Sequence, residues 1–188
     1  MFQRWAAAHG FDFEEEDRTP GSEAGIGSAE WASCESPVGG GYDNQTGDDA
    51  GTTTDRIAAT VAGGLGNTAT NEGATVAGGI TNHATGQYSF VGGGTGNTAG
   101  FTGATVAAGV GNSATNYYSS VGGGFENLAS GFAATIPGGY QNTATALYSF
   151  ASGYRAKSLA NGAFVWSDNN AFDFQEATPN RFSVRATG

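Results

Sequence analysis

The sequence predicts an all-β chain folded as a β-solenoid with turns of fifteen residues. Three observations predict this fold: an aliphatic residue recurs every fifteen positions, an asparagine follows each one by six, and an alanine follows by eight. A short fixed period is typical of repeat architectures in which each unit stacks on the last. The aliphatic row is Val61, Val76, Val91, Val106, Val121 and Ile136. The asparagine row is Asn67, Asn82, Asn97, Asn112, Asn127 and Asn142.

Each unit is expected to contain two short strands. Fifteen residues are too few for two helices, and the Gly-Gly pairs and β-branched residues oppose a helix. One strand centres on the aliphatic row and the other on the alanine row, with Gly-Gly-x-x-Asn turning between them. Stacking seven or eight such rungs at the usual strand spacing gives a rod of roughly 35 Å. Glycine makes up 33 of 188 residues, but without the three-residue period of collagen.

The asparagine row has two structural interpretations. Identical amides one rung apart can hydrogen-bond along the rod and form an asparagine ladder. Alternatively, asparagine is present because it tolerates a left-handed turn conformation. Both interpretations are structural rather than catalytic.

The interior of a single rung is expected to be lean. It holds one Val or Ile, one Ala, and a small residue such as Ala59 or Ser89. That burial opposes the ordering entropy of fifteen residues only weakly. We therefore predict a homotrimer, in which neighbouring copies supply the missing interior; a thin monomeric rod is the alternative.

Other apolar rows must face outwards. Tyr88, Tyr118 and Tyr148 recur every thirty residues, and Phe90 and Phe150 lie two residues after the outer pair. These aromatics either fill an interface between chains or stack on sugar rings or a protein partner. A second row contains Leu65, Ile80, Val110, Phe125 and Tyr140.

The repeat predicts three segments. Residues 1–37 form an acidic assembly or linker segment, residues 38–154 form the repeat domain, and residues 155–188 form a C-terminal cap or neck. Val38 to Asn44 matches the start of a unit, but the next aliphatic residue is 23 positions on, which predicts a loop insertion near 48–56. The solenoid is expected to end near Tyr154. A C-terminal apolar plug is expected from Phe164, Trp166, Phe172, Phe174 and Phe182.

Charge and cysteine content exclude several classes of function. The net charge is -10, and no Lys or Arg lies between Arg56 and Arg155. Nucleic acids and anionic lipids both require such cations, so neither is an expected partner. The single cysteine, Cys34, excludes a disulfide framework. We expect neither membrane insertion nor a secretory signal at the start, because the apolar runs are too short.

No catalytic or cofactor site is expected. Glu72 and Glu126 lie 3.6 rungs apart along the predicted rod, roughly 17 Å, which is too far for a glycosidase pair. His83 lacks a nucleophile partner and is interpreted as a surface histidine. Weak candidates for a cation site are the crowded carboxylates Asp43, Asp48, Asp49 and Asp55. Their spacing matches no calcium motif, so a solvated loop is the preferred interpretation.

An ice-binding face is a further hypothesis. The row before the aliphatic position contains Thr60, Thr75, Thr105 and Thr135, but Phe90 and Phe150 interrupt it. The two phenylalanines break the flat threonine face that such binding requires.

The unit V-x-G-G-x-x-N-x-A, extended by Gly86 and Gly131 to V-x-G-G-x-x-N-x-A-x-G, resembles the YadA-type head repeat of trimeric autotransporter adhesins. Similar repeats occur in tail-fibre-type proteins. The stretch from Ser149 to Trp166, followed by Asn180 to Ala186, resembles the end of such arrays before an endosialidase-type chaperone. The resemblance covers about 38–188 and implies a left-handed parallel β-roll, three chains wide, in the head or shaft of a surface fibre. The family repeat is commonly one residue shorter, with an aliphatic residue where this chain has Gly63, Gly78 and Gly93.

The sequence therefore predicts a non-catalytic structural protein on a cell, fibre or virion surface, outside the cell. Its expected partners are its own copies and a host or surface glycan or protein receptor. The alternative is a subunit of an extracellular filament assembled end to end through the acidic N-terminal segment. A weaker alternative is an ice- or polysaccharide-binding β-solenoid.

Overall fold

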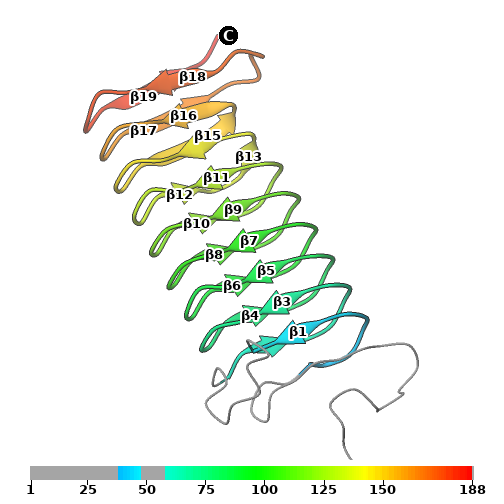
Figure 1. Ribbon diagram of the computed structural model, residues 1–188. Helices are drawn as coiled ribbons and strands as arrows, with labels where there is room; N and C mark the ends of the chain where they lie inside the picture. Colours follow the sequence, from blue (N-terminus) through cyan, green and yellow to red (C-terminus); the bar gives the residue numbers. More distant parts are fainter. Residues whose placement is uncertain (1–37, 48–57, 188) are drawn as a thin grey trace, which may run out of the picture.

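The computed structural model describes residues 38–47 and 58–187 of the chain. These residues contain strands and turns but no helix. The chain winds through about eight turns whose strands pair in parallel with those of the turns above and below (Figure 1). The predicted β-solenoid of fifteen-residue rungs is confirmed. Residues 1–37, and the insertion predicted near 48–56, lie outside the described residues.

Two parallel sheets form the broad faces of the rod. The alanine sheet carries the alanine row and, within the described ranges, has nine strands. It consists of β1 (Gln45–Thr46), β3 (Thr68–Ala69), β5 (His83–Ala84), β7 (Thr98–Ala99), β9 (Ser113–Ala114), β11 (Leu128–Ala129), β14 (Thr143–Ala144), β16 (Ala156–Ser158) and β18 (Phe174–Glu176). The valine sheet carries the aliphatic row. It consists of β2 (Thr60–Val61), β4 (Thr75–Val76), β6 (Phe90–Val91), β8 (Thr105–Val106), β10 (Ser120–Val121), β12 (Thr135–Ile136), β15 (Phe150–Tyr154), β17 (Phe164–Ser167) and β19 (Phe182–Arg185), with β13 (Gly139–Tyr140) paired to β15.

The register of both sheets follows the sequence period. Val76 pairs with Val91, and Ala84 pairs with Ala99, each an offset of fifteen residues. At the start of the rod, Gln45 pairs with Thr68 and Val38 with Val61, an offset of 23. The first rung therefore stacks in register with the second, and the extra residues fall between Gly47 and Ala58.

Each strand of the repeat points one residue outwards and buries the next. All six members of the aliphatic row are buried, as are the alanines opposite them. A third inward row alternates between Ala and Ser, as in Ala74 and Ser89. The expectation that neighbouring copies must complete the interior is wrong, because the side chains of one chain, asparagines included, already fill it.

The buried asparagines connect each rung to both of its neighbours. The Asn97 amide nitrogen donates to the Gly93 carbonyl of its own rung and to the Gly109 carbonyl of the next, both at 2.8 Å. Its amide oxygen accepts the backbone N–H of Asn112 at 2.9 Å. The same bonds recur along the row, so the ladder runs mainly from amide to backbone. Satisfying all these groups matters because an unpaired buried amide is costly.

The left-handed turn conformation belongs to other residues. Among the described residues, the position just before each asparagine has positive φ, as in Gly66 (64°), Thr81 (51°) and Glu126 (52°), whereas the asparagines of the row do not. The glycine three residues after each aliphatic residue is required for a different reason. A Cβ on Gly79, at φ +92°, would collide with the Gly94 carbonyl and the Asn82 amide.

The roll continues beyond Tyr154, so the predicted boundary there is wrong. Phe150 pairs with Phe164, and Phe164 pairs with Phe182, in the same sheet. The rung after Ala151 is one residue shorter than the repeat, which moves Ala156 rather than Lys157 under Asn142. A prediction that extends the period of fifteen residues therefore no longer finds the asparagine and alanine rows here, although the strands continue to pair.

The expected C-terminal apolar plug is also wrong for most of its members. Phe150, Phe164 and Phe182 stack on the outer face of the valine sheet, with ring centroids 4.3 and 4.5 Å apart. Phe172 is exposed, whereas Phe174 packs partly buried against the last turn of the core. Phe174 takes the inward position that Ala156 and the asparagines occupy in earlier rungs.

Substituting Asp for Val106 tests the inward row. The change places an unpaired charge inside a rung and should lower the free energy of unfolding by about 4 kcal/mol or more. Thr105→Asp, one residue away on the outer face, is the matched control and should cost far less. Urea unfolding of both variants checks this, and equal stability of the two would contradict the assigned orientation.

Asn97→Asp tests the asparagine ladder. A carboxylate cannot donate to the Gly93 and Gly109 carbonyls, so the variant should lose about 3 kcal/mol or more of stability at neutral pH. Burial raises the pKa of the introduced carboxyl, and its protonated form can donate again. The variant should therefore regain stability as pH falls from 7 to 5, whereas Thr98→Asp should not. Denaturant unfolding across this range measures the difference.

Candidate functional site

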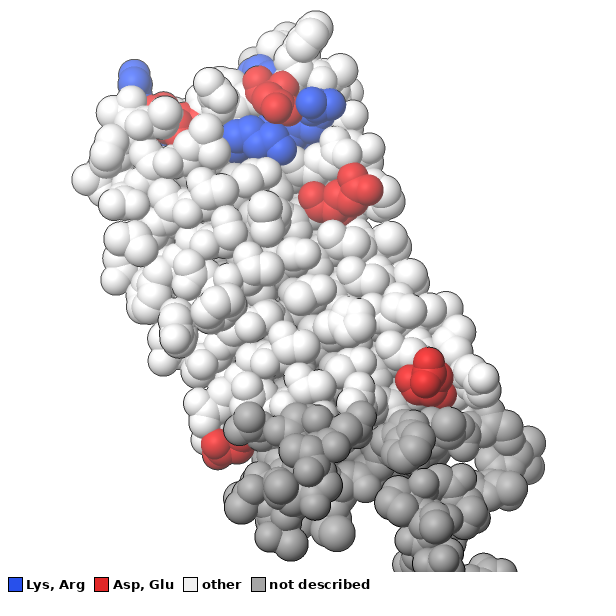
Figure 2. Space-filling model, viewed as in Figure 1, with Lys and Arg blue, Asp and Glu red and all other residues white. Residues whose placement is uncertain are grey.

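The body of the rod is almost free of charge. Figure 2 shows white surface over most of the rungs, with the basic side chains gathered at the C-terminal end. Glu72 and Glu126 are the acids of the central rungs. The arrangement offers long uncharged surfaces rather than a charged patch.

One narrow edge, here called the bridged edge, is an apolar row at the Gly-Gly turns. Successive members from Leu65 to Tyr140 pair with one another as parallel bridges. Phe125 and Tyr140 stack with ring centroids 5.2 Å apart, and Tyr140 and Tyr154 stack at 4.9 Å. Its members are Tyr42, Leu65, Ile80, Thr95, Val110, Phe125, Tyr140 and Tyr154. Ile80 and Val110 are each 45% exposed, so this row leaves substantial apolar surface in contact with water.

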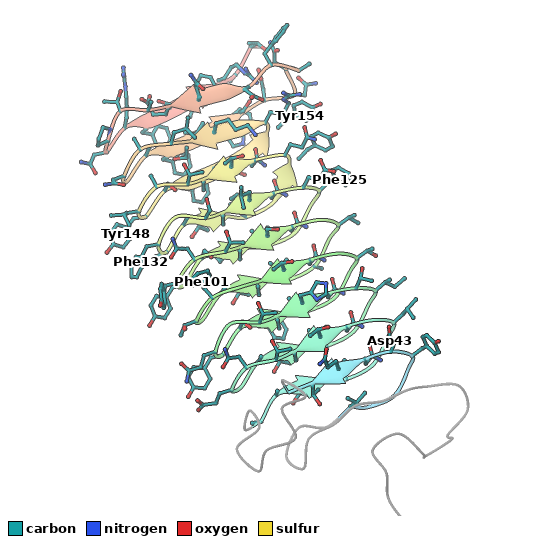
Figure 3. The ribbon with its side chains drawn as sticks, viewed as in Figure 1. Asp43, Phe101, Phe125, Phe132, Tyr148 and Tyr154 are labelled. Carbon is teal, nitrogen blue, oxygen red and sulfur yellow. The ribbon has the colours of Figure 1, made fainter. Side chains whose placement is uncertain are left out.

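The opposite narrow edge, here called the aromatic edge, carries ring side chains at the turns between the two sheets. Figure 3 shows Phe101, Phe132 and Tyr148 on this side, across the rod from Phe125 and Tyr154. The rings meet edge to face: Tyr118 and Phe132 at 5.8 Å, and Phe132 and Tyr148 at 5.6 Å. The members of the edge are Tyr88, Phe101, Tyr117, Tyr118, Phe132 and Tyr148.

The three tyrosines of the aromatic edge have an unusual backbone. Tyr88, Tyr118 and Tyr148 have φ of 55°, 56° and 57°, a left-handed conformation that is an outlier for a bulky residue. In alternate rungs the same position is Gly73 and Gly103. A Cβ on either glycine would collide with the ring of the next tyrosine, so the rings of Tyr88 and Tyr118 occupy space that a glycine leaves open, whereas Ala133 takes this position before Tyr148. This alternation explains the doubled period of thirty.

The predicted aromatics separate into two places. Tyr88, Tyr118 and Tyr148 lie together on the aromatic edge, whereas Phe90 and Phe150 lie around the corner on the outer face of the valine sheet. Phe90 is 39% exposed there, between Thr75 and Thr105 of the proposed ice-binding row.

Sequence reasoning missed three members of the aromatic edge: Phe101, Tyr117 and Phe132. They fall one or two positions before the tyrosine row and so lie in different phases of the repeat. The signal that could have found them is the turn as a whole, because all three repeat positions lie in the same three-residue corner between the sheets.

The two carboxylates of the central rungs lie on opposite edges. Glu72 accepts hydrogen bonds from the Gln87 amide and the Tyr88 hydroxyl, both at 2.6 Å, and the bond to this carboxylate raises the pKa of Tyr88. Glu126 follows Phe125 on the bridged edge and accepts from the Gln141 amide at 2.7 Å. His83 lies half-buried on the outer face of the alanine sheet.

The weak cation site falls mostly outside the described residues. Asp43 lies on the first rung at the bridged edge, with φ of 57° (Figure 3). Asp48, Asp49 and Asp55 lie in the part that the structure does not describe. Among the described residues, no three His, Cys, Asp or Glu side chains group as metal ligands would.

The last rungs contain a cluster of charged hydrogen bonds. The Thr187 hydroxyl (2.6 Å), the Thr187 and Asn170 backbone N–H groups and the Arg185 guanidinium all donate to Asp168, which lowers its carboxyl pKa from 3.8 to about 2. The Ser183 hydroxyl and the Thr178 N–H donate to Glu176 and lower its pKa from 4.5 to about 2. Arg155 pairs with Asp173 at 2.7 Å. These bonds fix the chain where the repeat rows end.

Comparisons with known proteins give no assignment: no protein-family model matches the chain, and no curated protein matches it. Within the described ranges, no helix is long and apolar enough to cross a membrane.

The C-terminal cluster should be sensitive to acid. Because the pKa values of Asp168 and Glu176 are lower in the folded chain, both contribute stability above pH 4 to 5, and that stability is lost as pH falls towards 2. Hydrogen exchange, corrected for intrinsic rates, should show residues 164–187 losing protection between pH 5 and 2.5 before residues 91–121 do.

Asp168→Asn is the control for this effect. It removes one of the two titrating groups, so the protection of residues 164–187 should be lower at pH 6 and should change less with acid. Uniform loss of protection along the rod would contradict a locally titrating cap.

Proposed function

We propose that the protein is a non-catalytic attachment protein, a homotrimeric parallel β-roll that forms the head or shaft of a surface fibre outside the cell. The observation that carries this proposal is the bridged edge. A rod whose interior is already closed still exposes a row along its length that is apolar except at Thr95, and large exposed apolar surfaces in soluble proteins indicate association.

The geometry of the bridged edge favours association with copies of the same chain. Rotation about an axis parallel to the rod brings the same rung of each copy to the same height. With the bridged edge at the threefold axis, Ile80, Val110 and Phe125 of each copy then meet their equivalents around that axis, within a closed ring. In the central rungs the bridged edge carries one charged residue, Glu126 beside Phe125, so electrostatic repulsion between copies is confined to that height.

The proposed number of copies and handedness of the roll rest on the resemblance to YadA-type head repeats. The observed repeat and its buried asparagine row fit that resemblance. Three chains also give each bridged edge two neighbours, which covers more apolar surface than a single contact does.

A stiff rod suits an attachment role. Each turn is bonded to the next through both sheets, the bridged edge and the asparagines. Nine stacked strands in the alanine sheet span roughly 40 Å at the usual spacing. Such a rod can hold a binding surface away from the cell or particle that carries it.

Light scattering coupled to gel filtration tests the assembly. The expected mass is about 57 kDa, three times the 18.9 kDa of the chain. The variant Ile80→Thr/Val110→Thr/Phe125→Thr should shift the mass towards the monomer without unfolding, because Thr95 already occupies this row. The matched control, His83→Thr/Leu128→Thr on the outer face of the alanine sheet, should stay trimeric. A monomeric wild-type chain would contradict the proposal.

A further inference from the structure

We propose that the aromatic edge binds an extended neutral polysaccharide, a β-1,4-linked chain of uncharged sugars. This inference rests on the proposed attachment function and names the class of its receptor. It is carried by the spacing, backbone conformation and surroundings of Tyr88, Tyr118 and Tyr148.

The spacing of the tyrosines matches such a chain. They recur every two rungs, about 10 Å along the rod. In an extended β-1,4-linked glycan, alternate sugars face the same way, and the disaccharide repeat has nearly this length. Each tyrosine can therefore meet every second sugar in an equivalent position, because the rod and the glycan are both straight and periodic.

The backbone conformation indicates that the rings serve more than folding. A left-handed φ costs a bulky residue of order 1–3 kcal/mol, and Gly73 and Gly103 adopt it at the same position in neighbouring rungs without that cost. Glycine at all of these positions would relieve the backbone. The chain instead places a tyrosine there in three alternate rungs and leaves its ring largely exposed: 57%, 58% and 65% for Tyr88, Tyr118 and Tyr148.

The chemistry of the edge suits sugars. Aromatic rings offer faces to the C–H groups of a sugar ring, and a tyrosine hydroxyl can also bond a sugar hydroxyl. The Tyr88 hydroxyl is held by Glu72, whereas no protein group in the described part of the chain bonds those of Tyr118 and Tyr148. No Lys or Arg lies between residues 56 and 155, so the edge has no cation to recruit an acidic polysaccharide.

The two edges differ in ways that suit different partners. The bridged edge is a continuous row in which Phe125, Tyr140 and Tyr154 lie stacked, as a packed interface requires. The aromatic edge alternates exposed tyrosines with Gly73, Gly103 and Ala133, and within the described part of the chain the Tyr118 and Tyr148 hydroxyls have no protein partner. A surface with protruding rings suits contact with individual sugar rings better than close packing against a second copy of the chain.

The triple variant Tyr88→Gly/Tyr118→Gly/Tyr148→Gly tests the proposal on the full chain. Glycine already occupies this position in alternate rungs, so the variant should fold with the same circular dichroism and an equal or higher melting temperature. The wild type should be retained on cellulose or chitin and should bind the matching soluble hexasaccharide. The variant should lose retention, with binding weaker by more than about tenfold. The conservative Tyr118→Phe variant should still be retained.

Dextran, a neutral α-linked glycan, and polygalacturonate, an acidic one, should not retain the wild type. The bridged-edge variant Ile80→Thr/Val110→Thr/Phe125→Thr should still bind the hexasaccharide, even as a monomer, which separates this inference from the assembly. The proposal is overturned if the wild type binds neither cellulose nor chitin, or if the glycine variant binds as well as the wild type. It is equally overturned if the glycine variant loses its trimeric mass, since that assigns the edge to contact between copies.

Discussion

The fold depends on one buried amide per rung. Each asparagine side chain of the row bonds backbone groups of its own rung and of the next, as that of Asn97 does with Gly93, Gly109 and Asn112. With only a valine and two small residues beside it, a rung has little apolar area to bury. The asparagine fills the remaining space and fixes the height of the next turn. Positions such as Gly79 must be glycine, because the carbonyl of the next rung and the asparagine amide bonded to it approach too closely for any side chain there.

Once the interior is closed by one chain, the outer rows are free to serve contacts. The two narrow edges use that freedom differently. The bridged edge repeats every rung and presents a largely apolar row, whereas the tyrosines of the aromatic edge recur every second rung, with Phe101 and Phe132 between them. The proposed assembly and the proposed receptor binding use opposite sides of the rod, where one need not obstruct the other.

Much of the architecture could be predicted from the sequence, because a strict period fixes register and orientation together. The aliphatic and alanine rows, the two sheets and the rung length all follow from it. The filled interior could not be predicted in this way. The asparagine is read from the sequence as a turn or ladder residue, and the volume of its side chain is not counted as part of the core. The end of the roll could not be placed from a fixed period, because the pairing offset falls to 14 at Phe150↔Phe164 and rises to 18 at Phe164↔Phe182. Phe101, Tyr117 and Phe132 were missed, because their edge combines three phases of the repeat.

The alternation of glycine and tyrosine also limits how such a chain can change its length by duplication or loss of repeats. Removing the fifteen residues around Gly103 would bring Tyr88 directly against Tyr118, whose ring needs the space that the glycine leaves. Inserting one extra fifteen-residue rung either creates the same conflict or places two rungs without a tyrosine next to each other. A rung such as that of Gly103 should therefore be lost without steric conflict only together with a neighbouring tyrosine rung.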